Sequence, residues 1–163
     1  MPDPTTRIPE AEIRAPAPDC RSFATRGLLP SAKSREALRA ELGAPDEIES
    51  IPVRNRHVPE QTDTLSVYSY AGLSATFYVL PARDLLSSVA VRDRRWLRFS
   101  APTIGDPVDR VRALLGPADE TVTPAGADTL EYGCGSLEGG YDPVFIVLEN
   151  DTVAEIRFSF YVD

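Results

Sequence analysis

Only one histidine, His57, occurs in the chain, so any Ser-His-Asp triad, Cys-His pair or multi-histidine metal site has to use it. His57 lies in the polar stretch RNRHVPEQ, and no nucleophile motif of the G-x-S-x-G type accompanies it. An ordinary surface histidine is therefore the better interpretation. We predict that the protein is not an enzyme and has no catalytic residue.

Two further stretches carry groups that could bind an ion. Glu149, Asn150 and Asp151, with Asp142 nearby, offer oxygen ligands, but they lack the spacing of a calcium-binding loop, and a β-hairpin turn explains them better. The glycine-rich segment Gly133–Gly140, GCGSLEGG, has no following Lys-Ser/Thr pair and opens no helix, so it is interpreted as a flexible hairpin loop rather than a phosphate cradle. The sequence predicts no metal and no cofactor.

The two cysteines, Cys20 and Cys134, fit no C-x-x-C metal or redox motif. They could form one disulfide in an oxidising compartment or remain as two buried thiols in a reducing one. The chain as given has no export signal, which favours the cytoplasm, whereas a proline-rich leader is equally what remains after a signal is removed. These residues alone leave the compartment open.

Composition excludes several classes of protein. A chain of 163 residues with 42% hydrophobic content can bury one good core or two small ones. The net charge of −8 argues against nucleic acid or anionic lipid as the partner, and the short basic run Arg92–Arg95 is interpreted as a solvated turn. Residues 1–27 are proline-rich, hold no apolar stretch long enough to span a membrane, and are predicted to be a largely irregular leader.

The elements that must position these groups are indicated by a repeat. The stretch LRAELGAPDE, Leu38–Glu47, returns as VRALLGPADE, Val111–Glu120, 73 positions later. A phrase that recurs in this way reports architecture more directly than function.

Each copy of the phrase predicts a short helix. In the first, Ser34 is the expected N-cap, Leu38 and Leu42 share one face, and Gly43 ends the helix. In the second, Asp106 is the expected cap and Pro107 the first helical residue, and Gly116-Pro117 ends a helix with an apolar stripe of Val108, Val111, Leu114 and Leu115. Helices of this length are marginal alone, so both are expected to lie on a sheet.

Alternating segments that follow each helix predict that sheet. After the first helix, residues 64–80 form a hairpin around a turn at Ala71-Gly72, and residues 84–93 add a third strand. After the second, residues 128–134 and a hairpin over residues 144–160 repeat the order. We predict an α+β fold of two tandem repeats, residues 28–100 and 101–163, each a helix on a three-stranded antiparallel sheet, with residues 48–62 as a long exposed loop.

The tyrosines of the first hairpin indicate a possible binding surface. If Leu65, Val67, Phe77 and Val79 face the helix, strict alternation places Tyr68, Tyr70 and Tyr78 on the opposite face. That face either packs against the other repeat or forms an open partner surface with Trp96 as an anchor at its rim. The two alternatives stay open at this point.

A family resemblance rests on two short motifs. The segment Gly105–Pro117, followed by a meander that ends in an N-D-x-V-x-x-I turn and strand at Asn150–Ile156, resembles the SmpA/OmlA (BamE-like) outer-membrane assembly lipoproteins. Two such units in tandem resemble the β-lactamase-inhibitory proteins. Both resemblances cover about residues 30–163 and imply a non-enzymatic, extracytoplasmic binding or scaffold protein. The chain departs from these families because it has no lipobox at Cys20 and no cysteine pair within each unit.

The functional expectation follows from the resemblance and from the absence of catalytic motifs. We predict a non-catalytic protein-binding or envelope-scaffold module with a protein partner, no nucleic acid and no membrane insertion. The alternative is a module that binds a small molecule or lipid in a cleft between the repeats. The even cysteine count, the leader and the exported families together predict a Cys20–Cys134 disulfide and a periplasmic or secreted location, or a cytoplasmic one if the chain is full length.

Overall fold

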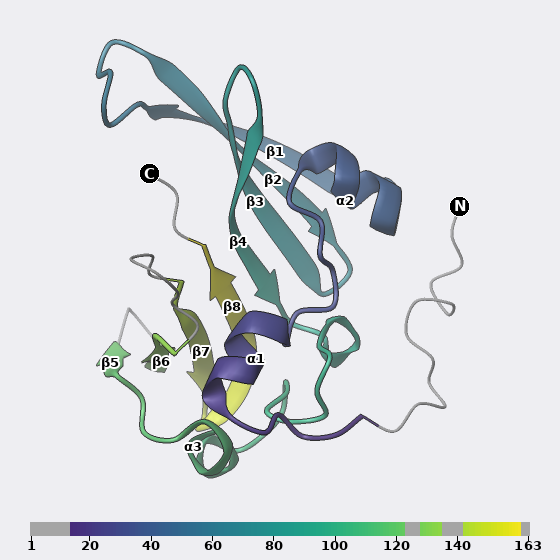
Figure 1. The fold of residues 1–163 in the computed structure, drawn as a ribbon, viewed down its shortest axis with the longest axis vertical. Coiled ribbons are helices and arrows are strands. Elements are labelled where there is room, and N and C mark those ends of the chain that lie inside the picture. Colours follow the sequence, from purple (N-terminus) through teal and green to yellow (C-terminus); the bar gives the residue numbers. More distant parts are fainter. Residues whose placement is uncertain (1–13, 123–127, 135–141, 161–163) are drawn as a thin grey trace.

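The computed structural model describes residues 14–122, 128–134 and 142–160, and over these residues it shows an α+β fold (Figure 1). The described helices are α1, Cys20–Arg26; α2, Arg35–Leu42; α3, Val108–Leu115; and a short 3₁₀ helix η2, Arg94–Trp96. They lie on a single antiparallel sheet, so the predicted fold class is confirmed.

The sheet has eight described strands in the order β1-β2-β3-β4-β8-β7-β6-β5. Strands β1–β4 follow α2 and strands β5–β8 follow α3, and the two groups join where β4 pairs antiparallel with β8. The strands are β1, Glu47–Arg54; β2, Thr62–Tyr70; β3, Leu73–Val79; β4, Asp84–Val91; β5, Glu120–Val122; β6, Asp128–Tyr132; β7, Val144–Glu149; and β8, Thr152–Ser159.

The prediction of three strands after each helix is wrong, because four follow each one. Strand β1 includes residues 48–54 of the segment predicted as a long loop, residues 48–62. It is an edge strand that pairs only with β2, and its side chains are exposed or half-buried, so no alternation of apolar and polar residues revealed it. Pro52 is tolerated there because an edge strand leaves one side of its backbone unpaired.

Both recurring phrases form the predicted helices. The Ser34 hydroxyl accepts a hydrogen bond from the Ala37 amide at 3.1 Å, as an N-cap does. Gly43 and Gly116 end the two helices at φ values of 88° and 84°, in the region that favours glycine. The predicted cap at Asp106 is wrong, since its carboxylate accepts from the Thr103 amide at 2.9 Å and α3 has no side-chain cap.

All three α-helices pack on the same face of the sheet. One rung of paired residues crosses it from β2 to β6, and residues paired across antiparallel strands point to the same face. Helix α2 contributes Arg39, which lies 5.3 Å from the Tyr68 ring centroid, and α1 contributes Phe23, 5.7 Å from Phe158. Tyr132 contacts the end of α3, because its hydroxyl donates to the Gly116 carbonyl oxygen at 3.0 Å. The rung consists of Tyr68, Ala75, Val89, Phe158, Val144 and Tyr132.

The register reverses the predicted orientation of β2, whereas Phe77 and Tyr78 of β3 face as predicted. Because Tyr70 pairs with Leu73 across the Ala71-Gly72 turn, Leu65 pairs with Tyr78 and Ser66 with Phe77. Leu65 and Val67 therefore lie on the face away from α2, whereas Tyr68 and Tyr70 share the helix-covered face with Phe77. The turn itself is where the alternation predicted it, with Gly72 at φ 76°.

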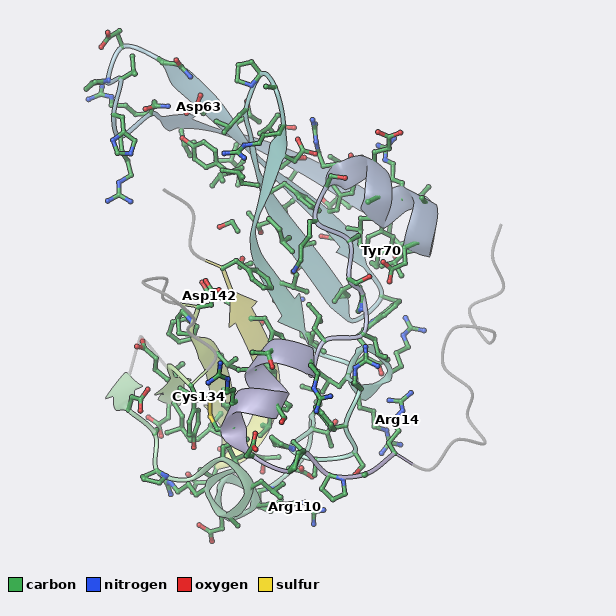
Figure 2. The ribbon with its side chains drawn as sticks, viewed as in Figure 1. Arg14, Asp63, Tyr70, Arg110, Cys134 and Asp142 are labelled. Atoms are coloured by element: carbon green, nitrogen blue, oxygen red, sulfur yellow. A yellow bond between two sulfur atoms is a disulfide. The ribbon has the colours of Figure 1, made fainter. Side chains whose placement is uncertain are left out.

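Helix α1 lies inside the segment predicted as an irregular leader, residues 1–27. Asp19 caps this helix, since its Oδ1 accepts from the Ser22 amide at 2.7 Å. A Cys20–Cys134 disulfide joins α1 to the segment after β6, with Cα atoms 5.9 Å apart (Figure 2). No helix among the described residues is both long and apolar enough to cross a membrane.

Candidate functional site

The four aromatic residues proposed as a partner surface do not share one surface. Tyr68 and Trp96 are buried, at 5% and 9% exposure, and belong to the core. Tyr70 is half-buried, and its hydroxyl donates to the Gly43 carbonyl oxygen at 2.9 Å. The Trp96 Nε1 donates to the Ala71 carbonyl oxygen at 2.8 Å, which fixes the β2–β3 turn. Of the four, only Tyr78 lies on the face opposite the helices.

The acidic stretch Glu149–Asp151 makes the β7–β8 turn, as its sequence predicted. Asn150 and Asp151 adopt φ values of 54° and 59°, a left-handed geometry that Asn and Asp tolerate better than most residues. Nowhere in residues 14–122, 128–134 and 142–160 do three metal-ligating side chains gather into a cluster. In the glycine-rich segment only Gly133 and Cys134 are described, and the rest of the predicted loop, residues 135–140, lies outside the described part of the chain.

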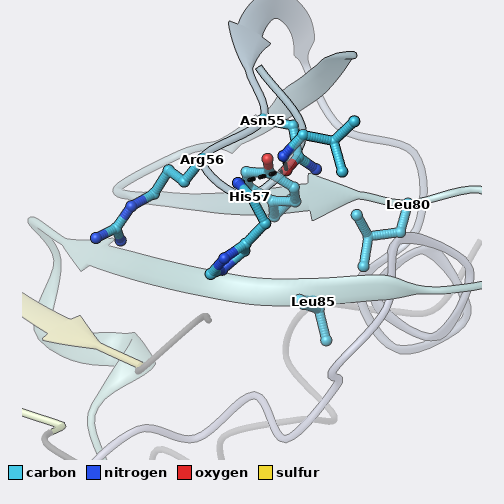
Figure 3. Close-up of a pocket in the computed structure, with 7 residues that line it drawn as sticks. Asn55, Arg56, His57, Leu80 and Leu85 are labelled. Carbon is cyan, nitrogen blue, oxygen red and sulfur yellow. Dashed lines mark hydrogen bonds between the residues drawn. The ribbon is translucent and has the colours of Figure 1, made fainter. Parts of the chain in front are cut away.

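The loop between β1 and β2 covers a pocket at the end of the sheet. The pocket has a volume of about 220 Å³ and is lined by Asn55, Arg56, His57, Val58, Tyr78, Leu80 and Leu85 (Figure 3). His57, interpreted from the sequence as an ordinary surface histidine, is exposed, and its ring also points into this space. Tyr78 of β3, Leu80 of the β3–β4 turn and Leu85 of β4 are half-buried and supply the floor and walls.

A buried carboxylate holds the loop in place. Asp63, the second residue of β2, is 5% exposed, and its oxygens accept from Asn55 Nδ2 at 2.6 Å, from Gln61 Nε2 at 2.7 Å and from the Tyr78 hydroxyl. These donors, Tyr78 first, lower the pKa of Asp63, because each favours its charged form. The same contact raises the pKa of Tyr78, which keeps its hydroxyl a donor.

The loop is also closed by its own backbone. Asn55 Oδ1 accepts from the amides of His57 and Val58, both at 2.8 Å, which is an Asx turn. The Asn55 amide donates to the Gln61 carbonyl oxygen at 2.9 Å, and the Gln61 amide donates to the Val58 carbonyl oxygen at 2.8 Å. The residues that border the pocket are thus held in one arrangement before any ligand binds.

The face opposite the helices is the second candidate surface, and we call it the open face. It consists of two rows of paired residues, Ile51–Leu65–Tyr78–Leu85 in the first half and Ala90–Arg157–Phe145–Glu131 in the second. Because all three α-helices of the described residues pack on the other side, no described helix covers it. The pocket lies at its β1–β2 end, where Tyr78 and Leu85 belong to both.

Charge is distributed unevenly over the open face. The first-half row is apolar apart from the Tyr78 hydroxyl, and Ile51 is 37% exposed. In the second half, Glu155 accepts from Arg92 at 3.0 Å and from Arg157 at 2.9 Å, so it is neutralised locally. The apolar end is therefore the pocket end.

The sequence reasoning missed Asp63, Asn55 and Gln61 because none belongs to a named catalytic or metal motif. A signal was available, because Asn55 and Gln61 flank a short polar loop and Asp63 follows in a segment that alternates like a strand. Asp63 is buried there, and a carboxylate is rarely buried without hydrogen-bond partners. The strand β1 had first to be recognised for that pattern to be seen.

Comparison with known proteins corrects the family resemblance. No family model matches the chain, and no curated protein does. A cysteine-rich secretory protein from Staphylococcus aureus is similar with a TM-score of 0.50 and 10% identity, over 91% of this chain and 50% of that one. An extracellular protein from Bacillus anthracis that contains an SCP domain is similar with a TM-score of 0.45 and 10% identity, over 93% and 49%.

The chain thus spans about half the length of the solved structures that it matches. The resemblance to the SmpA/OmlA (BamE-like) lipoproteins and to the β-lactamase-inhibitory proteins is therefore wrong, because the structural similarity is to a cysteine-rich secretory protein. At 10% identity that similarity concerns the fold. The error arose because the quoted motifs consist of helix ends and turns, which unrelated α+β proteins share.

Proposed function

We propose that the protein is a non-catalytic module that acts outside the cytoplasm and binds a partner protein on its open face. The observation that carries the proposal is the placement of every described α-helix on one side of the sheet, which leaves half-buried apolar side chains on the other. Sheet faces of this kind serve as interaction surfaces when their apolar residues adjoin each other. The Cys20–Cys134 disulfide supports an oxidising location, since such bonds persist mainly outside the cytosol.

The proposal includes a duplicated architecture, with units at residues 28–100 and 101–163. The strongest support is a matched pair of contacts: Tyr70 donates to the Gly43 carbonyl oxygen at 2.9 Å, and Tyr132 donates to the Gly116 carbonyl oxygen at 3.0 Å. Each tyrosine thus holds the end of the helix of its own unit. Because β4 and β8 join the units through a strand ladder, the two sheets form one wide face.

Site-specific photo-crosslinking tests the proposal. A photoreactive phenylalanine analogue replaces Thr76 on the open face, and the matched control carries it at Glu36, which is exposed on α2. In intact cells and culture fluid of the source organism, we expect a specific adduct from position 76 alone. The adduct protein is then purified and its affinity for the chain is measured.

Substitutions decide whether that binding uses the open face. Thr76→Arg should abolish most of the affinity, whereas Glu36→Arg should leave it unchanged, with thermal unfolding showing that both variants fold. Equal affinity of the two variants for the purified partner would refute the proposed function.

A further inference from the structure

We propose that the pocket under the β1–β2 loop receives one apolar side chain of the partner protein, taken from a segment in which a carboxylate lies next to that side chain. This inference rests on the proposed function and adds the chemistry of the partner. It follows from the size of the pocket, the nature of its walls, the charge at its rim and the fixed shape of its loop.

The size fits one side chain. At about 220 Å³ the pocket exceeds the ~150 Å³ of an engineered cavity that holds benzene, and it falls short of the ~300–1,000 Å³ usual for sites that enclose a small-molecule ligand. An aromatic or branched aliphatic side chain fills such a volume. A lipid or a cofactor of ordinary size does not fit within it.

The walls select for an apolar group. Val58, Leu80 and Leu85 and the ring of Tyr78 face the space, and polar groups border it at the loop. The carboxylate of Asp63 does not compete for a ligand hydrogen, because its oxygens already accept from Asn55, Gln61 and Tyr78. Burial of an apolar side chain here would remove water from the apolar walls of the pocket.

The rim selects for a carboxylate. Arg56 is exposed, lines the pocket and makes no hydrogen bond or ion pair within the described residues. Asp63 raises the pKa of Tyr78, and the Arg56 guanidinium offsets a small part of that rise. Figure 3 shows the Arg56 side chain extending from the loop to the side away from Leu80 and Leu85. Arg83, which does not line the pocket, is exposed three residues after Leu80 in the β3–β4 turn. In a chain of net charge −8, the positive charge of Arg56 at the rim is complementary to an acidic segment.

The loop is preorganised for this role. Its two backbone hydrogen bonds and the Asx turn at Asn55 hold Arg56 and Val58 in place without a ligand. A partner segment would then lose freedom on one side of the interface only, which favours binding by a short anchor. Anchors of this kind, an apolar side chain in a pocket, carry much of the affinity at many interfaces.

NMR titration of the ¹⁵N-labelled chain tests the inference with three capped tripeptides, Asp-Phe-Asp, Lys-Phe-Lys and Asp-Ala-Asp, and with 3-phenylpropionate. We expect Asp-Phe-Asp to shift the amide signals of the pocket residues and to bind about 1.4-fold to fivefold more tightly than Lys-Phe-Lys, the range for one exposed ion pair. Asp-Ala-Asp should not bind measurably. Binding of 3-phenylpropionate without Asp-Phe-Asp would overturn the inference in favour of a free small molecule.

Two variants and a control sharpen the test. Arg56→Ala should abolish the preference for the acidic peptide, whereas Arg54→Ala, an exposed arginine two residues earlier that does not line the pocket, should preserve it. Leu85→Trp should fill the pocket and abolish binding of both phenylalanine peptides. Dispersed amide signals show that each variant folds. Equal effects of Arg56→Ala and Arg54→Ala would overturn the charge selection.

The two proposals fail separately. If Leu85→Trp leaves the affinity for the purified partner unchanged while Thr76→Arg abolishes it, the pocket is not the anchor site and the open face still binds. If Asp-Phe-Asp binds the pocket but Thr76→Arg has no effect on the partner, the pocket site holds and the proposed use of the open face is wrong.

Discussion

The two halves of the sheet differ in how much structure holds them. At the β5–β8 end, α1 and α3 both cover the sheet, the Cys20–Cys134 disulfide ties α1 down, and the edge strand β5 has three residues. At the β1–β4 end, α2 is the one α-helix of the described residues that covers the sheet, and the mostly exposed strand β1 continues past it (Figure 1). We call the β5–β8 end the braced half and the β1–β4 end the projecting half. The pocket lies in the projecting half.

Removing the disulfide should have the largest effect on this comparison. The bond closes a loop with a sequence separation of 114 residues, and in the chain-entropy model its loss costs about 4–5 kcal/mol of unfolding free energy. We expect the Cys20→Ser/Cys134→Ser variant to lose about that amount in denaturant titration. Hydrogen exchange should show the β5–β8 half losing more protection than the β1–β4 half. A uniform loss over both halves would break the distinction between a braced and a projecting half.

Matched leucines in the two helices should respond unequally. Leu115 in α3 is 7% exposed, so Leu115→Ala should cost about 2–4 kcal/mol of unfolding free energy. Leu42 in α2 is half-buried against the same core, and Leu42→Ala should cost about half as much. Denaturant titration of both variants measures the difference. Equal losses would mean that α2 packs as firmly as α3 and that the halves are held alike.

Sequence reasoning predicted where α2 and α3 end and missed which way β2 faces. The helix ends at Gly43 and Gly116 were predictable because a glycine that directly follows the apolar positions of a helix ends it through its own backbone conformation. The facing of Tyr68 was not, because it depends on which residues pair across the Ala71-Gly72 turn, and a shift of one position moves every side chain to the other face.

The candidate site was less predictable than the fold for the same reason. The residues that line the pocket come from the β1–β2 loop, β3, the β3–β4 turn and β4. Asn55, Tyr78 and Leu85 are far apart in the sequence and line one pocket because their strands are neighbours in the sheet. No local sequence motif marks Asp63, because the pairing of β1 with β2 is what brings Asn55 within hydrogen-bonding distance of its carboxylate. Local patterns therefore predicted how each helix begins and ends, while contacts across strands decided where the pocket forms.

Removing the matched tyrosine hydroxyls should have smaller and nearly equal effects. Tyr70→Phe and Tyr132→Phe each delete one hydrogen bond to the carbonyl oxygen of a helix-terminal glycine, worth about 1 kcal/mol. We expect losses within about 0.5 kcal/mol of each other in denaturant titration, because the two contacts are equivalent in the proposed duplication. A loss at one site and none at the other would count against the duplication.

The smallest effect should appear in acid, at the projecting end. Because hydrogen bonds from Tyr78, Gln61 and Asn55 lower the pKa of Asp63 below the ordinary value of 3.8, its unfolded form binds a proton more readily than its folded form. Its contribution is therefore fully present above pH 3.8 and is lost as the pH falls through the lowered value. In wild type, the protection factors of the His57 and Val58 amides, which donate to Asn55, should fall in that acid range once exchange is corrected for the intrinsic rate at each pH.

Asp63→Asn should show the lower protection factors already at neutral pH and lose the acid-dependent step, whereas Asp46→Asn, an exposed control at the other end of the β1–β2 hairpin, should behave as wild type. If the protection factors of these amides in wild type do not change between pH 5 and pH 2, Asp63 does not hold the loop, and the preorganised rim on which the peptide preference depends loses its physical basis.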